Sequence, residues 1–326
     1  MPLENIIGAM DKDKKLEELE KNIIEYINPL NDWAFKYLFG RKELMIDLLN
    51  DITHYKNPKA PKIIDIIYLN TNKLGSNVEV PGIIYDIRCK TDRDNEFIVE
   101  MQKKSQPFFQ KRVDFYMSKA VVSQEQSPIS EWRYNFNPVF GVFFMNFYDK
   151  IEPQTPIIHC SWKSDGRSPK VHSDNMQYWK IQLPHFRHKK LEDCKTNLDY
   201  WLYIIANMET IKGTLPFTDK KPIFKQLEQL AEYANLHQDD KWAYWQAQDQ
   251  IACTEGAMEM RYEEGVEVGL MKGRAEERKK AHEKDLRLAY KLFLSGMDLD
   301  QVAQTMELSL DELSNYIIDN QKSKEE

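Results

Sequence analysis

Two apolar segments that each carry an acidic residue constrain the fold of this chain more than any other feature. The first is residues 83–89 (IIYDIRC), the second is residues 96–102 (EFIVEMQ), and a polar stretch at 91–95 lies between them. Because side chains alternate along a strand, the second segment presents two different faces. One face carries Phe97, Val99 and Met101, and the other carries Glu96, Ile98, Glu100 and Gln102. Two strands joined by a short polar turn predict a β-hairpin.

The hairpin is expected to gather three polar side chains. Glu100 and Gln102 share a strand face about 6.5–7 Å apart, and we expect Asp86 to lie beside them on the neighbouring strand. Carboxylates on adjacent strands can hold a divalent cation such as Mg²⁺, which prefers oxygen ligands. In apolar strands, Asp86 and Glu100 would be costly to bury unless they are paired or bound to a metal. The alternative is that each carboxylate simply faces solvent, as most acidic side chains do.

The segments around the hairpin predict one sheet flanked by helices. Helices are expected at residues 41–51 and 107–126, and further strands at 62–69, 138–147, 157–162 and 176–183. Both helices carry an apolar stripe at helical spacing, for example Leu44 and Leu48 in the first. The order helix, three strands, helix, strand is typical of an α/β fold.

The chain after about residue 191 is predicted to be helical. Its stretch 263–284 is heavily charged and holds Gly265, Gly269 and Gly273. Each interior glycine costs a helix ~1 kcal/mol relative to alanine, so this stretch is either a fragile helix or a linker. Residues 286–320 predict three short helices that resemble a helix-turn-helix. Because the last of them lacks Lys and Arg, a module for protein interaction or dimerisation is favoured.

Charge and composition exclude several classes of protein. The 326 residues include 52 acidic and 45 basic side chains, a net charge of −7, so this is not a generally basic nucleic-acid coat protein. No apolar run approaches the ~18–20 residues that a membrane helix needs, and no secretory signal is expected at the N-terminus. The four cysteines form no C-x-x-C pair, and no Walker-type loop indicates a nucleotide cofactor. We expect a soluble, cytoplasmic protein.

Four motifs together resemble a known family. They are Asn28-Pro29 followed by Asp32-x-x-Phe35-Lys36-x-x-Phe39-Gly40; Tyr85-Asp86-Ile87 with Cys89; Phe97-Ile98-Val99-Glu100-Met101-Gln102; and Phe108-Phe109 with Arg112 and Tyr116. The set resembles the PD-(D/E)xK nuclease superfamily, and more closely its recombination-promoting nuclease, or transposase, branch. The resemblance extends over almost all of the chain after about residue 26. It implies a restriction-endonuclease-like α/β core (αβββαβ, a mixed sheet flanked by helices) and an α-helical C-terminal region.

The resemblance and the patterns together predict five regions. They are an N-terminal leader at 1–27, a nuclease-like domain at 28–188, a helical subdomain at 189–262, a charged helical linker at 263–285 and a small helical module at 286–326. The C-terminal helices are the candidate site for self-association.

The resemblance implies a Mg²⁺-dependent DNA endonuclease, with Mn²⁺ as an alternative ion. Asp86 and Glu100 would be metal ligands, and the Met101 carbonyl would be a third oxygen. Gln102 would occupy the place of the superfamily's lysine. Lysine can orient or deprotonate the attacking water through its positive charge, whereas glutamine is neutral and can only form hydrogen bonds.

Cations are concentrated just after the hairpin. Residues 103–119 hold five of them against one carboxylate, Asp114. Arg112 is the preferred DNA phosphate contact and Lys119 shares its helix face, since neutralised phosphates release counterions. The alternative is a solvated helix face.

Asp32 and Lys36 are further candidates near this site. Asp32 precedes a predicted helix and is expected either to be its N-cap or, by analogy with the family, to approach the metal. Lys36 lies four residues on, so the two side chains are also expected to pair.

Two functions from different classes follow. The first is a DNA endonuclease that serves DNA mobility or recombination in a bacterium. The second is a catalytically inactive nuclease-like module that binds DNA or protein, with the helical tail mediating assembly.

Overall fold

The computed structural model describes residues 25–55, 57–69, 86–125, 133–163 and 171–322. Residues 1–24 of the predicted leader and residues 83–85 of the first hairpin strand lie outside these ranges. The chain forms two compact units, one up to Asp249 and one from Gln250. All four cysteines are free. Within the described ranges, no helix is long and apolar enough to cross a membrane.

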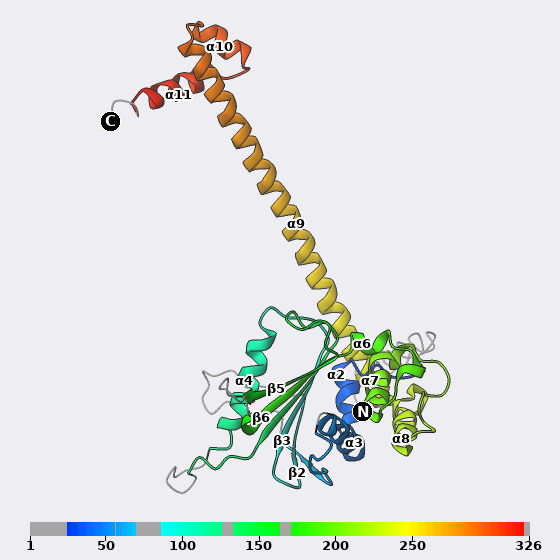
Figure 1. The fold of residues 1–326 in the computed structure, drawn as a ribbon. Coiled ribbons are helices and arrows are strands. Elements are labelled where there is room, and N and C mark those ends of the chain that lie inside the picture. The colour runs from blue at the N-terminus through cyan, green and yellow to red at the C-terminus, as the bar shows by residue number, and fades with distance from the viewer. Residues whose placement is uncertain (1–24, 56, 70–85, 126–132, 164–170, 323–326) are drawn as a thin grey trace, which may run out of the picture. The chain divides into compact units, whose positions relative to one another are not determined.

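Six strands of the first unit form one mixed sheet with the order β1-β2-β3-β4-β6-β5 (Figure 1). The strands are β1 (Ile66–Tyr68), β2 (Ile87–Thr91), β3 (Glu96–Gln102), β4 (Val139–Met145), β5 (Ile157–Lys163) and β6 (Val171–Gln182). β3 runs parallel to β4, and β4 parallel to β6, while the other pairs are antiparallel. The β2–β3 pair is the predicted hairpin, and the expected α/β fold with a mixed sheet is confirmed.

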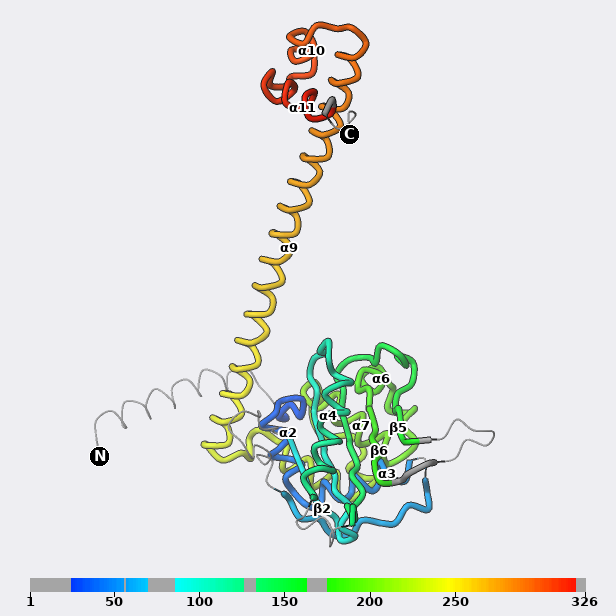
Figure 2. Tube along the Cα trace, turned by 90° about the vertical axis from the view of Figure 1, so that its left-hand side faces the viewer, coloured from blue at the N-terminus to red at the C-terminus, as the bar shows by residue number. Residues whose placement is uncertain are grey.

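Helices cover both faces of this sheet. α4 (Phe109–Val122) lies on one face, where Val113 and Met117 pack with Ile98 and Phe143. The opposite face shares one hydrophobic core with α2 (Asp32–Phe39), α3 (Lys42–His54), α7 (Asn197–Asn207) and α8 (Pro222–Ala231). Figure 2 views this unit turned by 90°, with α4 in front of α7. The two faces of β3 therefore separate as its alternation predicts.

α4 approaches the sheet closely at Gly141 of β4. A Cβ atom on Gly141 would lie 2.8 Å from Sδ of Met117 and 2.9 Å from Cβ of Tyr178, closer than real side chains tolerate. Glycine at this position lets the helix pack directly on the strands. Because Arg112 lies in the first half of α4, this packing sets the height of its side chain above the sheet.

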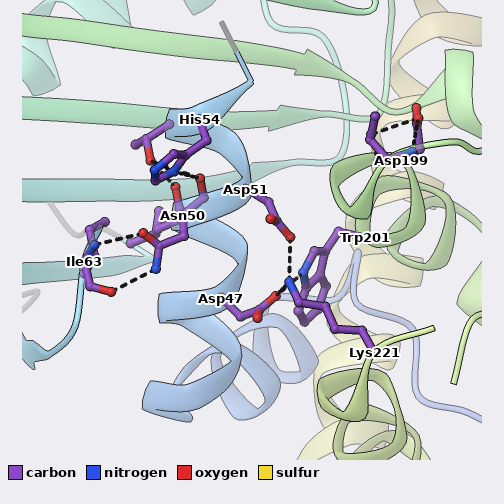
Figure 3. Close-up of polar contacts among 11 residues, drawn as sticks. Asp47, Asn50, Asp51, His54, Ile63, Asp199, Trp201 and Lys221 are labelled. Atoms are coloured by element: carbon purple, nitrogen blue, oxygen red, sulfur yellow. Dashed lines mark hydrogen bonds and ion pairs between the residues drawn. The ribbon is translucent and has the colours of Figure 1, made fainter. Parts of the chain in front are cut away.

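The strand predicted at residues 62–69 forms only over Ile66–Tyr68, and Asn50 of α3 explains the difference. The Asn50 side chain accepts a hydrogen bond from the Ile63 amide at 2.8 Å and donates one to the Ile63 carbonyl at 2.9 Å (Figure 3). Both backbone groups of Ile63 are thus bound to a helix side chain. The chain therefore joins the sheet only after this point.

Lys221, the residue before α8, is bound to two carboxylates of α3 (Figure 3). Its Nζ lies 2.6 Å from Oδ1 of Asp47 and 3.0 Å from Oδ2 of Asp51, and the Trp201 indole of α7 donates to Asp47 at 2.8 Å. Burial raises the pKa of Asp51, and the Lys221 ammonium opposes that rise. Lys221 therefore joins the start of α8 to α3, and Asp47 also joins α3 to α7.

The second unit has a small core of its own. α9 (Gln238–Leu294) ends at a Ser295-Gly296 break and is followed by α10 (Leu299–Thr305) and α11 (Leu310–Lys322). The core consists of Leu286, Ala289, Val302, Ala303, Leu313 and Ile317. The charged stretch with three glycines is helical throughout, and its side chains at 256–281 are all exposed.

Replacing Lys221 by alanine should lower the free energy of unfolding by on the order of 2–4 kcal/mol at pH 7, because two largely buried carboxylates lose the cation between them. Without the ammonium nothing opposes the effect of burial on Asp51, so its pKa rises further in the variant. The penalty is therefore absent below about pH 4 and grows towards neutral pH. Urea unfolding followed by circular dichroism measures the loss. Lys220→Ala is the matched control, since Lys220 pairs with Asp219 on the surface and its loss should change nothing measurable. Equal destabilisation by both variants would contradict the role of Lys221.

Candidate catalytic site

Asp86 and Glu100 lie opposite each other where the β2–β3 pair ends. Ile87 pairs with Val99, so the register continued by one residue places Asp86 beside Glu100. The Asp86 amide donates to Oε1 of Glu100 at 3.1 Å, and the Met101 amide donates to Oδ2 of Asp86 at 2.8 Å. Glu100 is 4% exposed and the Asp86 side chain 13%. Each carboxylate is therefore held in place by a backbone amide of the other strand.

The carbonyl of Met101 borders the same edge of β3. In an antiparallel pair, the N–H and C=O of one residue point to the same neighbour. Since the Met101 amide faces the β2 side of β3, its carbonyl faces that side too, whereas the Gln102 carbonyl accepts from Asn146 on the β4 side. The end of the β2–β3 pair thus carries two carboxylates, and the Met101 carbonyl faces the same side of β3.

Gln102 is fixed at both ends of its amide. Its Nε2 donates to Oε2 of Glu100 at 3.2 Å, and its Oε1 accepts from the Arg112 guanidinium. A second guanidinium nitrogen of Arg112 donates to Oε1 of Gln106 at 2.7 Å, and the group lies 5.8 Å from the centre of the Tyr116 ring. The amide nitrogen of Gln102 consequently faces the carboxylates, and its oxygen faces the helix.

Lys36 of α2 lies between two acidic residues. Its Nζ is 3.2 Å from Oδ2 of Asp32 and 3.6 Å from Oδ1 of Asp86. The predicted pairing of Asp32 with Lys36 is confirmed, and the contact with Asp86 adds a partner that the sequence did not indicate. α2 thereby brings both residues to the edge of the carboxylate pair.

The prediction of Asp32 as an N-cap is wrong. Asn31 caps α2, and its side-chain oxygen accepts from the amides of Trp33 at 2.9 Å and Ala34 at 3.3 Å. Asn31 has the extended backbone that an N-cap needs. Asp32 is already helical, and its side chain is 65% exposed.

Burial and repulsion from a neighbouring carboxylate raise the pKa of both carboxyl groups. Burial and the nearby Asp32 raise the pKa of Asp86 to about 6, against the lowering effects of the Met101 amide and Lys36. Burial and Asp86 also raise the pKa of Glu100 well above its usual range, although Arg112 counteracts this in part. The site therefore disfavours two negative charges at neutral pH, and a cation bound between them would relieve that strain.

The structure differs from the sequence-based expectation at two residues, Lys119 and Gln106. Lys119 lies about 10 Å further along α4 than Arg112, and its ammonium is 5.8 Å from the centre of the Phe115 ring. Among the described contacts, none joins Lys119 to the carboxylates. Gln106, which holds Arg112, was not singled out, because a polar residue in a loop before a helix has no distinctive pattern.

The mixed sheet flanked by helices is the α/β fold expected of the PD-(D/E)xK class. A family model described as PD-(D/E)XK nuclease family transposase matches residues 29–256, more than half of the chain, and the chain belongs to this family. No curated protein and no solved structure matches it. Nucleases of this family generally use divalent metals. The described residues contain no group of three or more His, Cys, Asp or Glu that could hold a metal ion.

Replacing Asp86 by asparagine should raise the free energy of unfolding of the metal-free protein at pH 7.5. The pKa of Asp86 is about 6 in the folded protein against 3.8 normally, so its ionisation opposes folding. This penalty is absent below about pH 4, grows between about pH 4 and pH 6, and is nearly full above pH 6. A shift of about two units corresponds to at most about 3 kcal/mol, and asparagine still offers an oxygen to the Met101 amide.

Urea unfolding in EDTA at pH 4.5 and pH 7.5 measures this effect. The gain should be small at the lower pH and largest at the higher one. A variant that is less stable than the native protein at pH 7.5 would show that the Asp86 charge does not oppose folding.

Proposed function

We propose that the protein is a Mg²⁺-dependent DNA endonuclease of the recombination-promoting nuclease, or transposase, type. The observation that carries this proposal is the opposition of Asp86 and Glu100, both largely buried and both with a raised pKa. Two carboxyl groups kept together in this way oppose folding unless a cation joins them. Such arrangements are concentrated at functional sites.

The donor set fits a hard cation. We assign Asp86, Glu100 and the Met101 carbonyl as ligands, because Mg²⁺ is usually bound through one or two carboxylates and completes its octahedron with waters. The bound ion, Mg²⁺ or Mn²⁺, would polarise the phosphodiester and lower the pKa of a bound water. Lys36 partly neutralises Asp86. When a metal ion replaces the Lys36 ammonium next to Asp86, Lys36 keeps Asp32 as its partner.

Gln102 and Arg112 are assigned to positioning. Arg112 fixes the Gln102 oxygen, so the amide nitrogen is available beside Glu100 to donate to a water or a phosphate oxygen. Gln102 cannot act as an acid or base at neutral pH. Arg112 has five N–H donors, and we assign those not used by Gln102 and Gln106 to a DNA phosphate. Lys119 would contact a second phosphate further along α4.

The neutral Gln102 favours one alternative. Lysine at this position could activate water with its charge, and glutamine cannot. The fold would then be a DNA- or protein-binding module without hydrolysis, with α10 and α11 mediating assembly. For the nuclease, the proposed setting is DNA mobility or recombination in the bacterial cytoplasm.

Incubation with supercoiled plasmid in Mg²⁺, Mn²⁺ or EDTA tests the proposal. We expect nicking that depends on the metal and falls at least ~100-fold in Asp86→Ala and in Glu100→Ala, since each removes a charge that holds the ion. Glu125→Ala, an exposed carboxylate after α4, is the matched control and should keep full activity. Undiminished nicking by Asp86→Ala would overturn its role as a ligand. Absence of nicking with every metal would favour the binding module.

Gln102→Ala should lower the single-turnover cleavage rate by about 10- to 100-fold. DNA affinity should change less than ~3-fold, because Gln102 is 8% exposed and positions a reacting group instead of anchoring the duplex. Quenched-flow cleavage and fluorescence anisotropy measure the two quantities. Equal losses in rate and affinity would contradict the positioning role.

A further inference from the structure

A cavity of about 210 Å³ opens between the start of α4 and the segment that follows β4. Phe109, Met145, Phe147 and Tyr148 are among the residues that line it. Phe109 meets Phe147 edge to face, with ring centres 5.5 Å apart. The volume is below the ~300–1,000 Å³ of pockets for drug-sized ligands, and the aromatic walls suit one flat ring.

The cavity and the carboxylate pair share one guanidinium group. Gln106 lines the cavity and accepts from Arg112 at 2.7 Å, while Arg112 also donates to Gln102, the neighbour of Glu100. Met145, another lining residue, is the strand partner of Gln102. A ring seated in the cavity would therefore lie one layer of side chains away from the carboxylates.

A buried ion pair fixes the outer wall of the cavity. Lys180 of β6 binds Oδ2 of Asp149 at 2.7 Å, and Oδ1 of Asp149 accepts from the amides of Ile151 and Glu152. The side chain of Gln182 accepts from the Asp149 amide at 2.6 Å. The segment that carries Tyr148 is thus preorganised by contacts to the sheet.

Three of the polar side chains that line the cavity already have partners in the protein. Gln106 binds Arg112, Gln110 binds Asp114 and Tyr178, and Asp149 binds Lys180. Their hydrogen-bonding groups are therefore poorly placed to read the edge of a particular base. A ligand would be held by stacking and by shape, which every nucleobase can satisfy.

The rim of the cavity is cationic and partly apolar. Lys150 is the lysine that lines it. Tyr148 is 48% exposed and Ile151 is 85% exposed at the mouth. Cations that follow a backbone and aromatic rings that stack on bases are the combination by which proteins hold unpaired nucleic acid.

We propose that this cavity accepts a single unpaired base of the DNA substrate. The inference rests on the proposed endonuclease function and specifies its substrate class as DNA with an unstacked nucleotide next to the cleaved phosphodiester. Tyr148 and Phe147 stack on the base, and the neighbouring phosphates lie towards Arg112 and Lys150. Fully paired duplex would have to extrude a base first, and this is easiest at mismatches, flaps and bulges.

The test uses binding without cleavage, so it is independent of activity. Full-length Asp86→Asn protein in EDTA is titrated into end-labelled hairpin DNA with one bulged nucleotide in its stem, either carrying a base or abasic. Fluorescence anisotropy gives the two values of Kd. We expect the bulged base to bind about tenfold more tightly than the abasic bulge, and the four bases to differ by less than about threefold. Because the change is made in the DNA, the result does not depend on whether any further variant folds.

Two further variants, each made in the Asp86→Asn protein, test whether the cavity is the binding site of the base. Tyr148→Ala should bring the ratio of the two Kd values close to one. Phe115→Ala, which removes a ring 50% exposed on α4 that does not line the cavity, should leave the tenfold ratio intact. A ratio near one in the parent protein, or a tenfold ratio that survives Tyr148→Ala, would overturn the assignment.

If the native protein cleaves plasmid but the two Kd values are equal, the nuclease proposal stands and the base-pocket proposal is wrong. If the protein binds the bulged base more tightly but never cleaves DNA, the base-pocket proposal stands and the nuclease proposal is wrong.

Discussion

The enforced proximity of Asp86 and Glu100 is the constraint on which the rest of this structure depends. In the antiparallel β2–β3 register the two carboxylates lie just beyond the last paired residues. A backbone amide donates a hydrogen bond to each of them. Burial makes the charged state of both groups unfavourable. The hydrophobic cores on either side of the sheet must offset that penalty, and at ~25 cal/mol per Å² of buried apolar surface they have ample area to do so.

Helix α4 connects this strained pair to its surroundings. Gly141 lets the helix lie directly on the sheet, and Arg112 then reaches both Gln102 on β3 and Gln106 in the preceding loop. One cation thereby orients the side chain beside Glu100 and braces the wall of the neighbouring aromatic cavity. The chemistry proposed for the carboxylates and the recognition proposed for the cavity are physically joined through this residue.

The parts of the site that follow from local periodicity were predictable. The alternation of Phe97 to Gln102 fixed which side chains face α4, and the polar turn fixed that Asp86 returns beside Glu100. The expected strand at 62–69 was too long because Asn50, from another element, takes both backbone groups of Ile63. Asp32 was misassigned as the cap because Asn31 and Asp32 are both good N-cap residues, and propensity cannot decide between neighbours.

The amino-acid sequence by itself determined the hairpin, the two faces of its second strand, the α/β order and the family, because each is written in spacings of a few residues or in a local motif. Only the tertiary structure decided that Lys36 reaches Asp86, that Arg112 holds Gln102 and that Lys221 joins α3 to α8. It also decided that an aromatic cavity opens between the start of α4 and the segment after β4. These contacts join side chains on elements distant in the chain. Their distances depend on how closely helices pack on a sheet, which is a property of complementary side-chain volumes and not of any local pattern.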